Sequence, residues 1–113
     1  MNIQRKRNEV SRLLRMSNRD RNAFRWSTNE TKAHIDMKFE ICKKLKEWGH
    51  EFYTEVIFDD SGLRADVIDA DEGIIYEVVN TESSGSIIRK KSLYPLEIRV
   101  VNANQKFSEE LLL

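Results

Sequence analysis

The stretch that decides the fold is RADVIDADEGIIYEVV, residues 64–79. It contains two runs rich in β-forming residues, 65–70 and 74–79, and the turn Asp71-Glu72-Gly73 separates them. A further run, Phe52 to Phe58, precedes this stretch and is rich in Tyr, Val, Ile and Phe. Three strands joined by short turns predict an antiparallel meander.

A helix is predicted before the meander. Met37, Ile41, Leu45 and Trp48 recur every three or four positions, which is the spacing of one helix face. Thr28 or Asn29 is expected to cap its start, and Gly49 to end it.

A second helix and a final strand are predicted after the meander. Ile87, Ile88, Lys91 and Tyr94 follow helical spacing and stop before Pro95. Residues 96–101 then predict a strand beside that of Glu77, reached through the helix as a crossover. The element order is therefore α-β-β-β-α-β, an α/β fold with a central mixed sheet flanked by helices. The tail, residues 107–113, predicts one or two helical turns whose leucines cover the core or, as an alternative, meet a partner subunit.

The net charge of zero, from 19 basic and 19 acidic residues, hides two unlike parts. Residues 1–27 hold eight basic and two acidic side chains, a local charge of +6, and residues 28–113 carry −6. We therefore expect a basic N-terminal arm on an acidic domain, and basic arms often contact phosphates. The candidate nucleic-acid contacts are Arg5, Lys6, Arg7, Arg12, Arg15 and Arg19.

The same segment also fits an arginine-rich surface helix. Val10, Leu13 and Leu14 follow helical spacing, so the charge can belong to a solvated helix face. Phe24 and Trp26 close the segment and are expected to pack it onto the domain. The alternative is that they stack on a base.

Ionisable residues occupy inward positions of the first predicted helix. At 100° per residue, Glu30 and Lys38 each fall 40° from His34, on the stripe that Ile41 and Leu45 continue. Inward charges are costly unless they are paired or open onto a cleft. Such an arrangement favours a functional site, and the alternative is that Glu30 and Lys38 snorkel to solvent at the helix end.

Two acidic residues lie in predicted strands at positions where apolar residues would be expected. Asp66 and Glu77 lie inside β-forming runs, although neither residue type favours strands. On adjacent antiparallel strands such acids can approach each other, and two close carboxylates call for a cation. Oxygen ligands of this kind favour Mg²⁺ or Mn²⁺, which can activate a water for attack on a phosphate. A nearby lysine would stabilise the charge that develops.

The sequence resembles the PD-(D/E)XK nuclease superfamily in its motif RADV at residues 64–67, which is followed by YEVV at residues 76–79. The closer resemblance is to the restriction-endonuclease-like proteins of the competence-protein type. This resemblance spans residues 30–101. It includes the pattern His-x-x-x-Lys at His34 and Lys38 and the acid Glu55 on the first strand. It implies metal-dependent cleavage of DNA. The implied metal ligands are Asp66, Glu77, the backbone carbonyl of Val78, and Glu55.

One position departs from the family pattern. The usual lysine two residues after the glutamate is Val79 here. Lys38, which faces inward, or Lys90 or Lys91 on the second predicted helix would have to supply its charge. If none does, the chain binds nucleic acid without cutting it. A third alternative is a small interaction protein that assembles through its apolar tail.

The remaining features set the expected context. The single cysteine, Cys42, excludes an internal disulfide, and no apolar run reaches the roughly 20 residues of a membrane span. The first residues lack the apolar stretch of a secretory signal, so we expect an intracellular protein with no membrane partner. A domain this small that cuts both strands of a duplex would need a second copy, which makes a homodimer one possibility.

Overall fold

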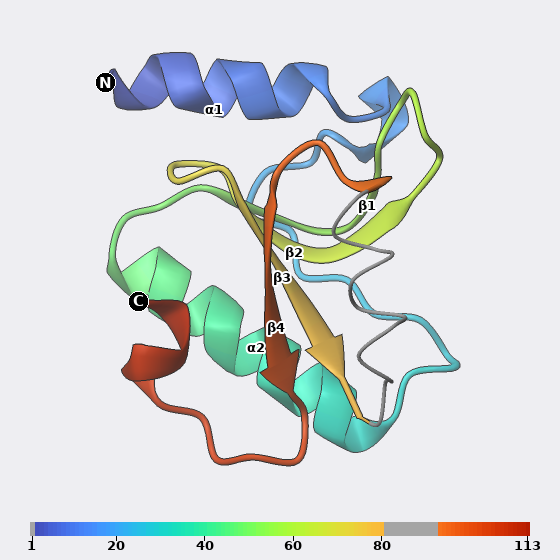
Figure 1. Ribbon diagram of the computed structural model, residues 1–113, viewed down its shortest axis with the longest axis vertical. Helices are drawn as coiled ribbons and strands as arrows, with labels where there is room; N and C mark the ends of the chain where they lie inside the picture. The colour runs from blue at the N-terminus through green and yellow to red at the C-terminus, as the bar shows by residue number, and fades with distance from the viewer. Residues whose placement is uncertain (1, 81–92) are drawn as a thin grey trace.

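The computed structural model describes residues 2–80 and 93–113 (Figure 1). All predicted strands are confirmed to within one residue at each end. The helix expected near residues 87–94 falls largely outside the described residues, and so do Lys90 and Lys91. In chain order the elements are the helix α1 (Ile3–Arg12), the 3₁₀ turn η1 (Met16–Asn18), the helix α2 (Lys32–Glu47), the strands β1 (Phe52–Ile57), β2 (Arg64–Asp69), β3 (Ile74–Val79) and β4 (Glu97–Asn102), and the 3₁₀ turn η2 (Glu109–Leu112).

The strands form one mixed sheet in the order β1-β2-β3-β4. β1 and β2, and β2 and β3, are antiparallel, whereas β4 lies parallel to β3 with Glu77 opposite Val100. The final strand therefore occupies the expected place. A row of apolar side chains crosses the sheet on one face and is made by Tyr53, Ile68, Ile75 and Ile98.

The two helices cover opposite faces of this sheet (Figure 1). α2 buries Met37, Ile41 and Leu45 against one face. α1 packs Val10 on the other face, and Leu14, two residues beyond the helix end, is buried there too. The expected α/β architecture is thus present, and the basic N-terminal segment is itself one of its layers. Burial of these apolar positions outweighs the charge of their neighbours in placing α1.

The chain between α1 and α2 covers the outer edge of β1. The Arg15 N–H donates to the Ile57 carbonyl (2.9 Å), and Asn22 exchanges two hydrogen bonds with the backbone of Phe52. Further along, the Arg25 N–H donates to Thr54 Oγ1 (2.8 Å). An edge strand satisfied in this way cannot pair with another chain.

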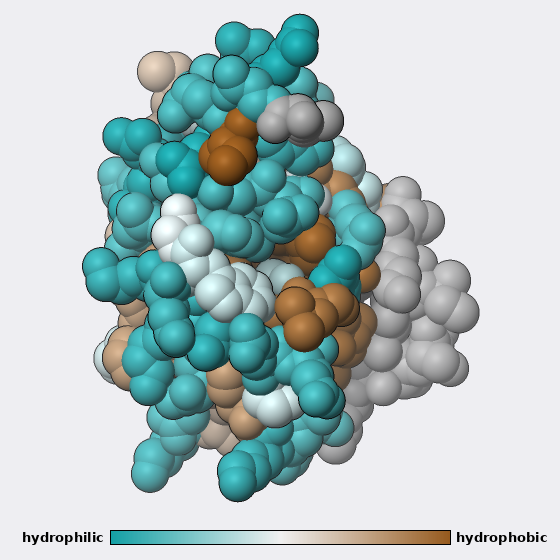
Figure 2. All heavy atoms as spheres, turned by 90° about the vertical axis from the view of Figure 1, so that its left-hand side faces the viewer, coloured by the Kyte–Doolittle hydropathy of each residue, from teal (hydrophilic) through white to brown (hydrophobic). Residues whose placement is uncertain are grey.

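The C-terminal residues close the sheet on the α2 side. Leu112 is buried, and its carbonyl accepts hydrogen bonds from the Tyr76 hydroxyl (3.1 Å) and from Arg99 (3.0 Å). The expectation that the tail covers the core is confirmed for Leu112, whereas Leu113 is exposed. Figure 2, which looks at the left-hand side of Figure 1, shows a mainly hydrophilic surface with a few hydrophobic side chains between polar ones. Among the described residues, none of the helices has the length and apolar character needed to cross a membrane.

Leu14→Ala tests whether the basic segment is part of the core. Leu14 is 0% exposed, so its truncation should lower the free energy of unfolding by about 2–5 kcal/mol. Met16, two residues away and 82% exposed, is the matched control, and Met16→Ala should change stability by less than about 0.5 kcal/mol. Urea denaturation measures both, and equal stability of the two variants would contradict the packing of the basic segment against the sheet.

Candidate functional site

Lys38 of α2 is buried at the end of the sheet where α2 begins. Its side chain is 0% exposed, and Nζ donates to Glu55 Oε1 (2.7 Å), Glu30 Oε1 (2.9 Å) and the Arg25 carbonyl oxygen (2.8 Å). An ammonium has three N–H donors, so all of them are used. The alternative that Lys38 snorkels to solvent is therefore wrong. Lys38 is the cation that holds the surrounding acids in place.

The start of α2 places Glu30 beside this lysine. The expected cap at Thr28 or Asn29 is wrong, because the helix begins later and Thr31 caps it by accepting from the His34 N–H (3.2 Å). A turn precedes the cap, with the Glu30 N–H donating to the Ser27 carbonyl (3.2 Å). Glu30 thus belongs to a fixed turn outside the helix.

Glu55 and Asp66 lie opposite each other where β1 and β2 lose their regular alternation. Tyr53 and Val56 are three residues apart yet both face α1, and Ala65 and Ile68 behave in the same way on β2. Regular strands place residues on one face only at even spacings. The break falls at Glu55, which has a φ of 50°, in the left-handed region that non-glycine residues rarely adopt. It turns both carboxylates toward α2.

His34 lies between the acids of the helix start and those of the sheet. Its Nδ1 is 3.4 Å from Glu30 Oε2, and its Nε2 is 3.5 Å from Asp66 Oδ2. The pKa of His34 is raised, first by its hydrogen-bonding interaction with Asp66 and further by the charges of Asp66 and Glu30, which together outweigh burial.

Asp66 and Glu77 meet across β2 and β3, as the sequence predicted. The two carboxyl groups share a hydrogen bond, and the Val78 N–H donates to Asp66 Oδ2 (2.8 Å). Burial raises the pKa of Asp66, but the hydrogen bonds from His34, Glu77 and Val78 outweigh it and hold that pKa below its usual range.

The pKa values of the second pair of acids, Glu30 and Glu55, are shifted in opposite directions. Burial, reinforced by a hydrogen bond with Glu30, raises the pKa of Glu55 to about 7. The pKa of Glu30 is lowered, because the hydrogen bonds from Glu55 and Lys38 outweigh the effect of burial. One lysine thus faces two carboxyl groups that share a proton.

These six residues form one continuous group, here named the ionisable cluster: Glu30, His34, Lys38, Glu55, Asp66 and Glu77. The cluster has four acids and two bases, so its acids outnumber its bases by two even when His34 is protonated. This excess of acidic groups fits a site that exchanges protons for a cation.

The donor set of the cluster fits a divalent cation. Single ligand atoms from Glu30, His34 and Asp66 lie within 4.8 Å of one another. Glu30 Oε2 and His34 Nδ1 are buried, and apart from their 3.4 Å approach to each other neither has a hydrogen-bond partner among the described residues. The Glu30 side chain is 9% exposed. Of the ligands that the resemblance implied, Asp66 belongs to this trio and Glu77 interacts with Asp66. Glu55 is engaged by Lys38 instead, and Val78 contacts Asp66 through its N–H.

The predicted phosphate contacts lie mostly elsewhere. α1 and the ionisable cluster are on opposite sides of the sheet, which separates Arg5, Lys6 and Arg12 from the cluster. The Arg7 guanidinium is held by Asp71 (2.7 Å), so its charge is already compensated. Arg15 and Arg19 flank η1, and Arg19 donates to the Leu14 carbonyl (3.1 Å).

Two groups beside the cluster were not predicted from the sequence. They are the backbone carbonyl of Arg25 and the guanidinium of Arg64, whose Nε lies 3.8 Å from Glu55 Oε2. Phe24 packs against Phe39 as expected, with ring centroids 5.3 Å apart, whereas the side chain of Trp26 is 57% exposed. The position of Arg64 at the start of a predicted strand was the one sequence feature that could have indicated its place beside the cluster. Nothing in the sequence indicates a backbone acceptor.

Comparison with known proteins does not assign the chain to a family. No family model matches it, and searches of curated proteins and of solved structures return no match.

Glu55→Gln tests the raised pKa of this residue. Because folded wild-type protein keeps the Glu55 proton up to a pH of about 7, whereas an unfolded glutamate loses it near 4.5, the free energy of unfolding falls as pH rises between these values. The fall attributable to Glu55 is on the order of 2 kcal/mol. Glu55→Gln should remove that part of the slope in urea denaturation between pH 4.5 and 8. An unchanged slope would contradict the shift.

Proposed function

We propose that the chain is a metal-dependent nuclease that cleaves phosphodiester bonds of DNA, built on a restriction-endonuclease-like fold. The observation that supports it most is the meeting of Asp66 from β2 with Glu77 from β3, beside His34 and Glu30 of the α2 start. The sheet order, with three antiparallel strands and β4 parallel to β3, agrees with the topology that the resemblance implies.

The proposal gives each member of the cluster a role. Asp66 and Glu77 would hold Mg²⁺ or Mn²⁺ together with Glu30 and His34, and the imidazole nitrogen in this set favours Mn²⁺. A bound divalent cation would supply Lewis acidity toward a phosphoryl oxygen and lower the pKa of a water molecule. The Val78 N–H orients Asp66 by donating to Oδ2. Such outer contacts commonly tune a metal site.

Lys38 acts as a positioning residue in this proposal. Its three N–H donors are all used by Arg25, Glu30 and Glu55, so it holds those groups and does not reach a phosphate. This observation also favours the second candidate, a nuclease-fold protein that binds nucleic acid without cutting it. Lys90 and Lys91, the other candidates for the missing charge, lie outside the described residues.

Asp66→Asn and Glu77→Gln test the proposed chemistry. Each should reduce Mn²⁺-dependent cleavage of labelled DNA by at least about 100-fold, which is the upper range seen when only an outer partner of a metal is removed. Asp60→Asn, the same change in an exposed loop, should cleave like the wild type. Circular dichroism would confirm that all three variants fold.

The two candidate functions give different results in the same assay. Cleavage by the wild type that both cluster variants lose supports the nuclease. Cleavage retained by both variants would overturn it. Wild-type protein that binds DNA but cleaves none with either Mg²⁺ or Mn²⁺ would establish the non-cleaving candidate.

A further inference from the structure

Trp26 is presented to solvent on a rigid segment next to the ionisable cluster. Its side chain is 57% exposed, although tryptophan is usually well buried. The preceding residue is fixed on both sides, because the Arg25 N–H donates to Thr54 Oγ1 (2.8 Å) and the Arg25 carbonyl accepts from Lys38 (2.8 Å). Thr54 is itself buried and donates to the Ala23 carbonyl. The indole is thus held one residue from a group that contacts the cluster.

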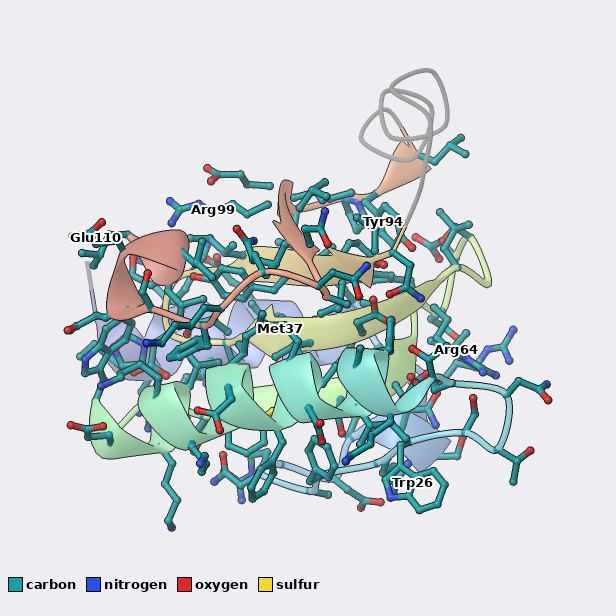
Figure 3. The ribbon with its side chains drawn as sticks, turned by 90° about the horizontal axis from the view of Figure 1, so that it is seen from below. Trp26, Met37, Arg64, Tyr94, Arg99 and Glu110 are labelled. Atoms are coloured by element: carbon teal, nitrogen blue, oxygen red, sulfur yellow. The ribbon has the colours of Figure 1, made fainter. Side chains whose placement is uncertain are left out.

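Two basic residues, Arg25 and Arg64, lie at the same end of the molecule as Trp26. Arg64 is exposed at the start of β2 and lies 3.8 Å from Glu55 of the cluster. Arg25 extends from the same segment as Trp26 and pairs with the exposed Asp20. Figure 3 shows Trp26 and Arg64 at the end of the molecule where α2 begins. An exposed aromatic side chain and an exposed cation therefore lie at the same end of the molecule as the cluster.

We infer that Trp26 and Arg64 form a binding platform for an unpaired nucleotide, with the base stacked on the indole and its backbone phosphate beside the guanidinium. Every base has a π-face that can stack on an aromatic ring, but inside a duplex both faces are covered by neighbouring base pairs. The inference rests on the proposed function and adds the form of its substrate. The substrate is a single strand, or a duplex with a single-stranded end.

The hydrogen bonds that fix the backbone at Arg25 favour a role for the exposed Trp26 ring in binding a base. Because the backbone beside Trp26 is already ordered, little conformational entropy is lost when a base stacks on the ring. The acids of the cluster repel phosphates, and Arg64 is an exposed cation placed to offset that repulsion beside the cluster.

The test uses the fluorescence of Trp26 in a Trp48→Phe background, which removes the only other tryptophan. The probes are a 12-nucleotide single-stranded DNA and a blunt 12-base-pair duplex, both in EDTA so that no cleavage occurs. We expect the single strand to quench Trp26 and the blunt duplex to leave it unchanged. Trp26→Ala should weaken single-strand binding by roughly 5- to 100-fold in fluorescence anisotropy, and Trp26→Phe should retain most of it.

Charge variants provide the matched control. Arg64→Gln should reduce the slope of log K against log salt for the single strand by about 0.7, the value for one phosphate contact. Lys46→Gln removes an exposed charge toward the far end of α2 and should leave that slope unchanged. Equal single-strand affinity of the wild type and Trp26→Ala would overturn the inference, and so would equal quenching by both probes.

The inference and the proposed function fail in distinguishable ways. If Trp26→Ala cuts single-stranded and blunt duplex DNA in the same ratio as the wild type, the platform is wrong while the nuclease stands. If the wild type cuts neither but Trp26 is quenched by the single strand alone, the nuclease is wrong and the platform serves binding.

Discussion

The burial of one ammonium group, that of Lys38, is the constraint on which this end of the molecule depends. A charge removed from water is tolerated only when nearby acceptors replace its hydration. Here the acceptors come from Glu30 before α2, Glu55 of β1 and the carbonyl of Arg25. Three separate parts of the chain thus bind a single atom, Lys38 Nζ. The hydrogen bond between this atom and the Glu55 carboxylate stabilises the left-handed backbone conformation of Glu55.

The same constraint explains the protonation of the cluster. Lys38 compensates one negative charge, and His34 can compensate a second, but four acids are present. Low solvent exposure makes further negative charge costly, and burial accordingly raises the pKa of Glu55 to about 7. A divalent cation entering the cluster would favour the deprotonated form of its acids, and its affinity would therefore rise with pH. This coupling links the acid–base properties of the folded protein to the proposed metal site.

Much of the fold could be predicted from the sequence because it depends on short-range periodicity. The runs around Asp66 and Glu77 marked β2 and β3, and inward positions of α2 identified His34 and Lys38 as unusual. The meeting of Asp66 and Glu77 followed from the pairing of adjacent strands. These inferences needed only the repeat of a helix or strand.

The remaining features depend on contacts between distant segments. The charge of residues 1–27 predicted a phosphate-binding arm, yet the buried Val10 and Leu14 place α1 on the side of the sheet away from the cluster. The break in the alternation of side chains at Glu55 cannot be predicted from a regular strand period. It arises because the buried ammonium of Lys38 needs hydrogen-bond acceptors. Sequence patterns report charge and spacing, but which face a charge occupies is decided by packing.

The most direct test of the central claim is an anomalous difference map from crystals of the protein soaked in Mn²⁺ at a pH near 8. The account predicts a peak within contact distance of Asp66 and His34, with Glu30 or Glu77 completing the ligands, and the loss of that peak in Asp66→Asn crystals. A map with manganese bound at other sites but none in the cluster would contradict it.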